Sequence, residues 1–126
     1  MSIAGFAAVG IGAALGAWMR WGLGLLLNPL FPALPYSSGT LAANLVGGYF
    51  IGICMAMLPS LSLETRLFAM TGFLGGLTTF STFSAEAISL LQREHYGLLA
   101  AHISLHLLGS LALTGLGIWT VHLLRN

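Results

Sequence analysis

Long apolar stretches alternate with short polar interruptions along this chain. Four stretches are apolar over about the 20 residues that a helix needs to cross a bilayer, and they cover residues 3–27, 40–58, 65–91 and 98–124. The interruption between the first two contains Pro29, Pro32 and Pro35, which favour a loop. The pattern therefore predicts an all-α membrane protein with four transmembrane helices in a single domain, residues 1–126.

The third apolar stretch differs from the others in its middle. Gly72, Gly75 and Gly76 are followed by hydroxyl and aromatic residues from Thr78 to Ser84. Glycine pairs and hydroxyl residues are poor helix formers, so we expect the third helix to be broken here. Backbone groups freed at membrane depth need partners from protein or water. Carbonyls freed by a break at Gly75–Thr79 could instead bind a hard cation such as Na⁺ or K⁺.

Charge is scarce along the chain. Only 6% of the 126 residues are charged and 57% are hydrophobic, whereas a soluble domain uses about 25% charged residues. The charged residues are Arg20, Arg66, Arg93, Arg125, Glu64, Glu86 and Glu94. A net charge of +1 provides no basic patch for nucleic acid. No nucleophile and base pair stands out, so we expect no enzyme activity.

The arginines are balanced between the two sides of the predicted bundle. Arg66 and Arg125 fall on the side of the termini, and Arg20 and Arg93 on the other side. The positive-inside rule therefore gives no orientation. Insertion in both directions, and an antiparallel dimer, become possible. The alternative is one orientation that weak local effects select.

Small residues recur at a spacing of four in the first two helices. Gly12 and Gly16 lie on one stripe of the first, and Gly48 and Gly52 on one stripe of the second. Such stripes let helix backbones approach closely in lipid. They predict helix packing and carry no further chemistry.

The fourth helix carries a polar stripe. His102, His106, Ser110 and Thr114 recur every four residues and so share one face over about 18 Å. A continuous polar track is one interpretation. Hydroxyls that bond to their own backbone four residues earlier are another. A metal site at the two histidines lacks a Cys or carboxylate at suitable spacing.

The centre of the third stretch offers groups that suit a small anion. Phe80 and Phe83 are interleaved with Ser81 and Thr82; aromatic edges are electropositive and hydroxyls donate hydrogen bonds. Ordinary core packing of the phenylalanines is the alternative. Asn44, one turn into the second helix, either bonds to another helix or donates into a pathway.

Two charged residues lie well inside apolar stretches, away from the stretch ends where Arg66 is found. Arg20, between Trp18 and Trp21, either reaches the membrane interface or attracts anions at a vestibule. Glu86 is the only acid within any apolar stretch. A cation pathway would be expected to have carboxylates near its middle.

The run from Gly72 to Glu86 resembles the signature of the bacterial Fluc (CrcB) fluoride channels. The segment Gly39–Leu45 is similar to the family's second motif, and Gly16–Trp21 and Leu108–Ser110 fit its first and last helices. The resemblance covers nearly the whole chain. It implies a dual-topology, antiparallel homodimer with two fluoride pores and a third helix broken at its centre.

The resemblance also implies roles for particular residues. A structural Na⁺ at the dimer centre would be held by the backbone carbonyls of Gly75 and Thr78. The fluoride pore would be lined by Asn44, Phe80, Ser81, Thr82, Phe83, Ser110 and Thr114. Arg20, Thr40, Glu86 and His106 would lie at the vestibule or beside the pore.

The implied role is passive fluoride export across the bacterial inner membrane, with the lipid bilayer and a second copy of the chain as partners. HF enters the cell as a weak acid and dissociates. The membrane potential then drives F⁻ out, at about 2.3 kcal/mol per 100 mV.

Two other functions fit a small four-helix membrane protein. A proton-coupled exporter needs a carboxylate in the membrane, for which Glu86 is the candidate. A structural subunit of a larger membrane complex would conduct no ions by itself.

Overall fold

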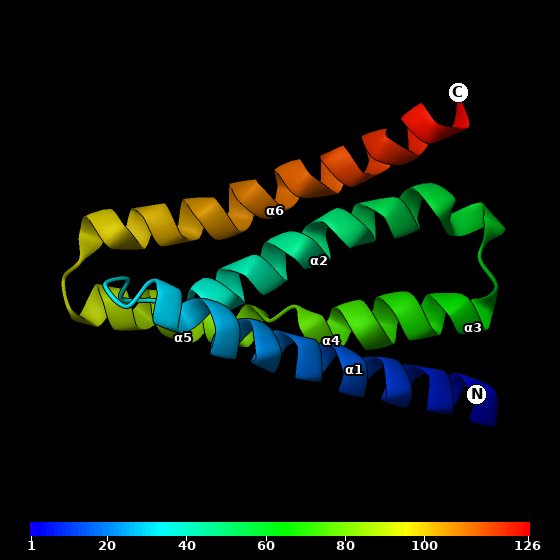
Figure 1. Ribbon diagram of the computed structural model, residues 1–126, viewed down its shortest axis with the longest axis horizontal. Helices are drawn as coiled ribbons and strands as arrows, with labels where there is room; N and C mark the ends of the chain where they lie inside the picture. The colour runs from blue at the N-terminus through cyan, green and yellow to red at the C-terminus, as the bar shows by residue number, and fades with distance from the viewer.

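The computed structural model describes all 126 residues, and they form helices without any strand. Figure 1 shows long helices lying side by side, with both termini at the same end of the molecule. Three helical segments are long and apolar enough to cross a membrane: Ile3–Leu30, Ser38–Ser60 and Tyr96–Arg125. A fourth segment, interrupted in its middle, lies between the second and the third of these.

The first two segments each consist of a long helix and a short 3₁₀ turn. Helix α1 spans Ile3–Leu27 and continues into η1, Asn28–Leu30. Helix α2 spans Ser38–Met57 and continues into η2, Leu58–Ser60. A proline follows the first residue of each 3₁₀ turn, where it disrupts the regular α-helical hydrogen bonding.

The interrupted segment consists of four pieces. Helix α3, Leu63–Arg66, runs into the wider π-helical turns of η3, Leu67–Leu74, and then into α4, Gly75–Leu77. Two extended residues follow before α5, Phe80–Gln92. Helix α6, Tyr96–Arg125, then returns along the whole molecule.

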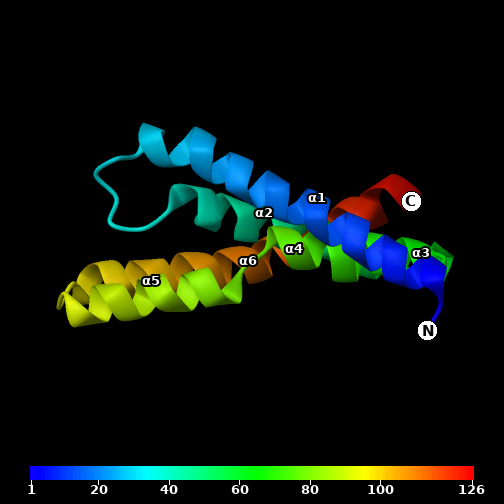
Figure 2. The same cartoon turned by 90° about the horizontal axis from the view of Figure 1, so that it is seen from below.

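The interruption changes the packing partner of the segment. Before it, η3 and α4 pack against α1; after it, α5 packs against α6. Figure 2 shows α5 beside α6 and away from α1. Helices α2 and α6 form the largest contact in the molecule. The site described below lies where these two packing arrangements meet.

Side-chain caps set where several helices begin. Ser37 accepts a hydrogen bond from the Thr40 N–H at 3.1 Å, which starts α2 at Ser38, two residues earlier than the apolar pattern predicts. Thr79 caps α5 in the same way by accepting from the Thr82 N–H at 3.2 Å. Asn28 ties the α1–α2 loop together because its side-chain oxygen accepts from the Gly39 N–H at 2.9 Å.

Two of the glycines illustrate how closely the helices approach each other. A Cβ added at Gly16 would overlap the backbone carbonyl oxygen of Phe73, and one at Gly52 would overlap that of Thr114. Only hydrogen fits at these two positions, so α1 approaches η3 and α2 approaches α6 at backbone distance.

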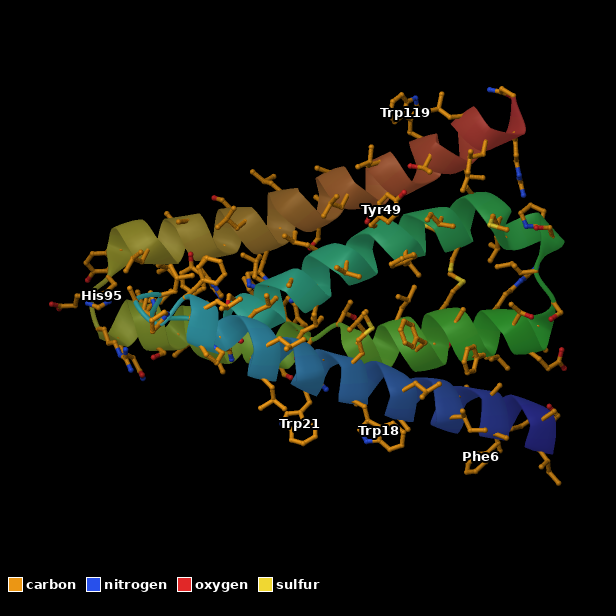
Figure 3. All side chains as sticks on the ribbon, viewed as in Figure 1. Phe6, Trp18, Trp21, Tyr49, His95 and Trp119 are labelled. Atoms are coloured by element: carbon orange, nitrogen blue, oxygen red, sulfur yellow. The ribbon has the colours of Figure 1, made fainter.

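Large apolar side chains cover the outside of the molecule instead of its inside. The buried hydrophobic residues are Ala43, Leu74, Leu77, Leu90 and Val121. Figure 3 shows Trp18 and Trp21 pointing outward from α1 and Trp119 pointing outward from α6. Lipid tails are as apolar as these side chains, so such a surface suits a bilayer.

Candidate functional site: polar groups around the interruption

The backbone at the interruption is held by the side chain of Asn44. Thr78 and Thr79 are extended, with ψ of 155° and 113°. The Asn44 side-chain oxygen accepts from the Thr79 N–H at 2.8 Å, and its nitrogen donates to the Thr79 carbonyl at 3.1 Å. Asn44 therefore supplies both hydrogen bonds that Thr79 loses by leaving the helix.

Asn44 also determines which ring nitrogen of His106 carries hydrogen. The Asn44 nitrogen lies 3.0 Å from His106 Nδ1. Because the amide nitrogen can only donate, Nδ1 accepts and Nε2 bears the hydrogen. The two hydrogens of the Asn44 amide are then both used within the chain, one by Thr79 and one by His106.

The carbonyl groups at the interruption differ in their partners. Arg20 Nε donates to the Gly76 carbonyl at 3.1 Å, so this arginine lies against α4. The carbonyls of Gly75 and Thr78 accept no hydrogen bond from backbone or side chain. Free carbonyl oxygens are the ligands that a hard cation such as Na⁺ prefers. The carbonyls of these two residues are therefore chemically suited to the predicted Na⁺ site.

The two phenylalanines have different surroundings. Phe80 is 79% exposed, and its ring centroid lies 5.7 Å from that of Phe83. Phe83 stacks on the His102 ring at 5.0 Å and contacts the His106 ring at 4.9 Å. Phe80 therefore presents a free ring edge, whereas Phe83 joins an aromatic cluster of α5 and α6.

The hydroxyls of the α6 stripe also differ from each other. Thr114 Oγ1 lies 2.9 Å from both the Gly48 carbonyl and the Ser110 carbonyl, so its hydrogen serves the α2–α6 contact and its own helix. The half-buried Ser110 hydroxyl makes no hydrogen bond. Only Ser110 of this pair has a donor that is free to meet a ligand.

A hollow of about 460 Å³ brings most of the predicted site residues together. Asn44, Thr78, Phe80, Phe83, His106, Ser110 and Thr114 line it, together with Gly75. Its lining contains no Asp or Glu. It lies between α2, the interrupted segment and α6 and opens to the outside of the chain.

The remaining predicted residues lie elsewhere. Arg20, Thr40 and Thr82 line a second hollow of about 500 Å³ near the α1–α2 loop. Ser81 is exposed, and its hydroxyl lies 3.3 Å from that of Thr79. Glu86 accepts a hydrogen bond from the Ser37 N–H at 2.9 Å, which joins α5 to the same loop.

Sequence reasoning missed two of these contacts. One is the bond between Ser37 and Glu86, which are 49 residues apart in the chain. Ser37 lies in a loop, where no periodic pattern indicates a partner. The contact between Arg20 and Gly76 was also not predicted, because it depends on how α1 crosses α4. No group of three His, Cys, Asp or Glu residues is placed to hold a metal ion, which leaves His102 and His106 without a third ligand.

These features define a multi-pass membrane protein with a carboxylate-free polar site between its helices. Residues 7–118 match the model of the family described as "CrcB-like protein, Camphor Resistance (CrcB)", and the chain belongs to this family.

Similar proteins carry a common name. A protein of Cupriavidus pinatubonensis is 58% identical over 95% of this chain and 96% of its own length, and is named "Fluoride-specific ion channel FluC". A protein of Ralstonia nicotianae with the same name is 56% identical over 98% of this chain and 99% of its own length. A third, from Thiobacillus denitrificans, is 55% identical over 95% of this chain and 98% of its length.

Proposed function

We propose that this chain is a fluoride-specific ion channel that passes F⁻ passively, and not an enzyme. The observation that carries the proposal is the match to relatives of that name, which are 58% identical over 95% of this chain in the first case. The polar site agrees with it chemically. Its lining offers hydroxyls and ring edges, and a carboxylate that would repel an anion is absent from it.

The path for fluoride runs along the hollow between α2, the interrupted segment and α6. A small anion that loses its water needs donors in replacement. The free Ser110 hydroxyl and the electropositive edge of the exposed Phe80 ring supply them here. Ser81 and Thr82 continue the hydroxyl donors along α5. Arg20 and Thr40, in the second hollow, provide a polar entrance that contains a positive charge.

The channel forms from two antiparallel copies with two pores. One copy leaves the carbonyls of Gly75 and Thr78 and the hydroxyl of Ser110 in a hollow that opens outward. Polar backbone groups are costly against lipid, so a second copy is the natural cover for this face. The balance of two arginines at each end suits insertion in both directions.

A Na⁺ ion at the centre of the dimer is part of the proposal. The carbonyls of Gly75 and Thr78 would hold it, and two copies would supply four such oxygens. When bound, the ion supplies positive charge that fixes the two interrupted segments against each other.

The physiological role is fluoride export across the bacterial inner membrane. HF that has entered the cell dissociates, and the potential drives F⁻ out through the passive channel, at about 2.3 kcal/mol per 100 mV.

The test is anion efflux from liposomes that contain the purified protein, with valinomycin and K⁺ setting the voltage. Fluoride efflux without chloride efflux is the expected result. If the folded protein released no fluoride, the channel hypothesis would be wrong. The proton-coupled exporter and the structural subunit would then be the remaining hypotheses.

A proton-coupled exporter remains the second candidate because Glu86 is a carboxylate inside the helical bundle with one buried, unpaired oxygen. Glu86→Gln distinguishes the two functions. An exporter loses its dependence on a proton gradient with this substitution, whereas a passive channel still conducts. The Glu64→Gln variant serves as the control, because Glu64 lies in the first turn of α3, near the opposite end of the molecule (Figure 1).

A further inference from the structure

Helix α5 is tied to the first two turns of α2 at two points. At the N-cap of α5, Thr79 forms two hydrogen bonds with the Asn44 side chain. Further along α5, Glu86 Oε2 accepts from the Ser37 N–H at 2.9 Å. Thr79 and Glu86 are seven residues apart, as are Ser37 and Asn44, which corresponds to about 10 Å along each helix. The two ties therefore match in spacing and hold α5 antiparallel to the start of α2.

Few other contacts fix the position of α5. Helix α6 is the only helix with which α5 makes an extensive contact, and Figure 2 shows these two helices side by side. The tie at Thr79 fixes only the beginning of α5, next to the interruption. A rod held at one end can still swing, so the direction of α5 relative to α2 depends on the second tie, at Glu86.

The Ser37 N–H needs a partner from outside α2. In a capping box, a Glu or Gln three residues after the N-cap accepts from the N-cap N–H. Ser37 is the N-cap of α2, but Thr40 occupies the third position and only donates its own N–H to Ser37 Oγ. Glu86 thus supplies from another helix the carboxylate that α2 lacks. Because Glu86 Oε1 has no partner, the Ser37 N–H is the one group in the chain that holds this carboxylate.

The second hollow is lined from both sides of this tie. Thr40, three residues after Ser37, is its lining residue from α2, and Thr82, four residues before Glu86, is its lining residue from α5. Residues four apart share one face of a helix, so Thr82 and Glu86 lie on the same side of α5. The other lining residues belong to α1 and η1. A movement of α5 away from α2 would therefore carry Thr82 out of this hollow.

We propose that Glu86 is a positioning residue for the entrance of the fluoride path. Its bond to Ser37 sets the distance between α5 and α2 at which Thr40 and Thr82 line one hollow. Glu86 lines neither hollow, so it acts through its acceptor oxygen and not by contact with the anion. A neutral side chain that keeps this oxygen can take the same role. The effect on fluoride rests on the proposed function, whereas the tie between the helices does not.

Hydrogen exchange of the Ser37 amide, measured by NMR in lipid bilayers, tests the tie. Ser37 is the only serine that follows a tyrosine, so ¹³C-carbonyl tyrosine with ¹⁵N serine selects its amide signal alone. We expect slow exchange in the wild-type protein and in Glu86→Gln, whose amide oxygen still accepts. Glu86→Leu should exchange about tenfold faster or more, because a hydrogen bond to a charged group is lost. Glu64→Leu, in the first turn of α3, is the matched control and should leave the exchange unchanged.

Two results would overturn the tie. One is Ser37 exchange in Glu86→Leu that equals the wild-type exchange. The other is wild-type exchange as fast as that of an unprotected loop amide, which decides the matter even if Glu86→Leu does not fold.

Anion efflux from liposomes tests the role at the entrance. We expect Glu86→Leu to release fluoride several-fold more slowly than the wild-type protein, and Glu86→Gln to release it faster than Glu86→Leu because the tie is restored. Fluoride efflux that is equal in Glu86→Leu and the wild-type protein, although Ser37 has lost its protection, would overturn the positioning role. Absence of fluoride efflux from the wild-type protein would instead contradict the proposed function, and Ser37 exchange would still decide whether the tie exists.

Discussion

Asn44 satisfies the backbone of the interruption with its side chain. It pairs both polar groups of Thr79 and also bonds to His106, so three elements depend on one amide. The sequence allowed two roles for it, a bond between helices and a donor in a pathway. The geometry favours the first, because both amide hydrogens are used inside the chain. In the proposed pathway, Asn44 therefore acts by positioning Thr79 and His106 and not by donating to fluoride itself.

Asn44→Ala tests this role. The substitution leaves the Thr79 N–H, the Thr79 carbonyl and His106 Nδ1 without partners. We expect a loss of about 2 kcal/mol in unfolding free energy, since hydrogen bonds in membrane proteins contribute about 0.6 kcal/mol on average and up to about 1.7. Denaturant unfolding in mixed micelles measures it. Ser60→Ala, which removes one exposed hydroxyl, is the control and should change little.

The two phenylalanines allow the pore and the fold to be separated. Phe80→Ile should reduce fluoride efflux and leave stability nearly unchanged, because Phe80 is 79% exposed within one chain. Phe83→Ile should reduce efflux and also destabilise the chain by about 1–2 kcal/mol, because it loses its ring contacts with His102 and His106. Wild-type fluoride efflux in both variants would contradict their assignment to the pore.

At the scale of elements, the interruption lets one segment pack against two different helices. The chain follows α1 up to Leu77 and follows α6 from Phe80 onward. Two extended threonines make this change of partner possible. Arg20 bonds to the backbone just before them, and Asn44 bonds to the backbone of the second one. The free carbonyls at the interruption are a consequence of the same geometry.

Close helix approach depends on glycine at specific positions. Gly16→Ala and Gly52→Ala place a methyl group against the backbone carbonyls of Phe73 and Thr114. We expect each to destabilise the protein by about 1–3 kcal/mol through overpacking. Gly10→Ala and Gly115→Ala are matched controls because an added Cβ there meets nothing within 4 Å. Thermal unfolding in detergent compares all four, and equal losses in both pairs would contradict the packing argument.

The turn between α5 and α6 carries the only non-glycine residue with positive φ. Glu94 has φ of 60°, and the N–H groups of Glu94 and His95 bond back to Leu91 and Leu90. This pattern is the Schellman ending of a helix, which normally places glycine at the left-handed position.

Glu94→Gly should therefore stabilise the protein by about 0.5 kcal/mol, because relief of left-handed strain exceeds the entropic cost of glycine. The same substitution at Glu64, in the first turn of α3, should destabilise it instead. Both variants are compared with the wild-type protein by denaturant unfolding. We expect the unfolding midpoint to rise slightly for Glu94→Gly and to fall for Glu64→Gly.

At the scale of the whole molecule, the apolar exterior and the polar hollow need different surroundings. Lipid satisfies the outward tryptophans, but it does not satisfy the carbonyls and the hydroxyl in the hollow. The fold of one chain is thus suited to the bilayer on most sides and to a protein partner on one. An antiparallel second copy is the partner that we propose.

Cysteine labelling in intact cells tests the orientation. Ser60 and His95 are exposed and lie near opposite ends of the molecule, where η2 ends and where α6 begins. In a Cys54→Ser background, Ser60→Cys and His95→Cys should each be labelled from both sides of the membrane. A single orientation predicts that the two positions are labelled from opposite sides only, which would remove the antiparallel dimer.

Much of this protein was determined by its sequence alone. Apolar stretches of about 20 residues with 6% charge across the chain predict membrane helices, because a bilayer admits little else. The run from Gly72 to Glu86 indicated the family before any geometry was known. The glycines and hydroxyl residues of the third stretch are weak helix formers, and they predicted a break where Thr78 and Thr79 leave the helix.

Only the tertiary structure decided what each polar group meets. Periodicity puts His102, His106, Ser110 and Thr114 on one face, yet it cannot tell that Thr114 bonds to Gly48 while Ser110 stays free. Nor could it show that Arg20 bonds to Gly76 or that Ser37 bonds to Glu86. These partners lie far apart in the chain, and the crossing of helices brings them together. Hydrogen bonds reach about 3 Å, so such contacts depend on three-dimensional packing that residue patterns do not encode.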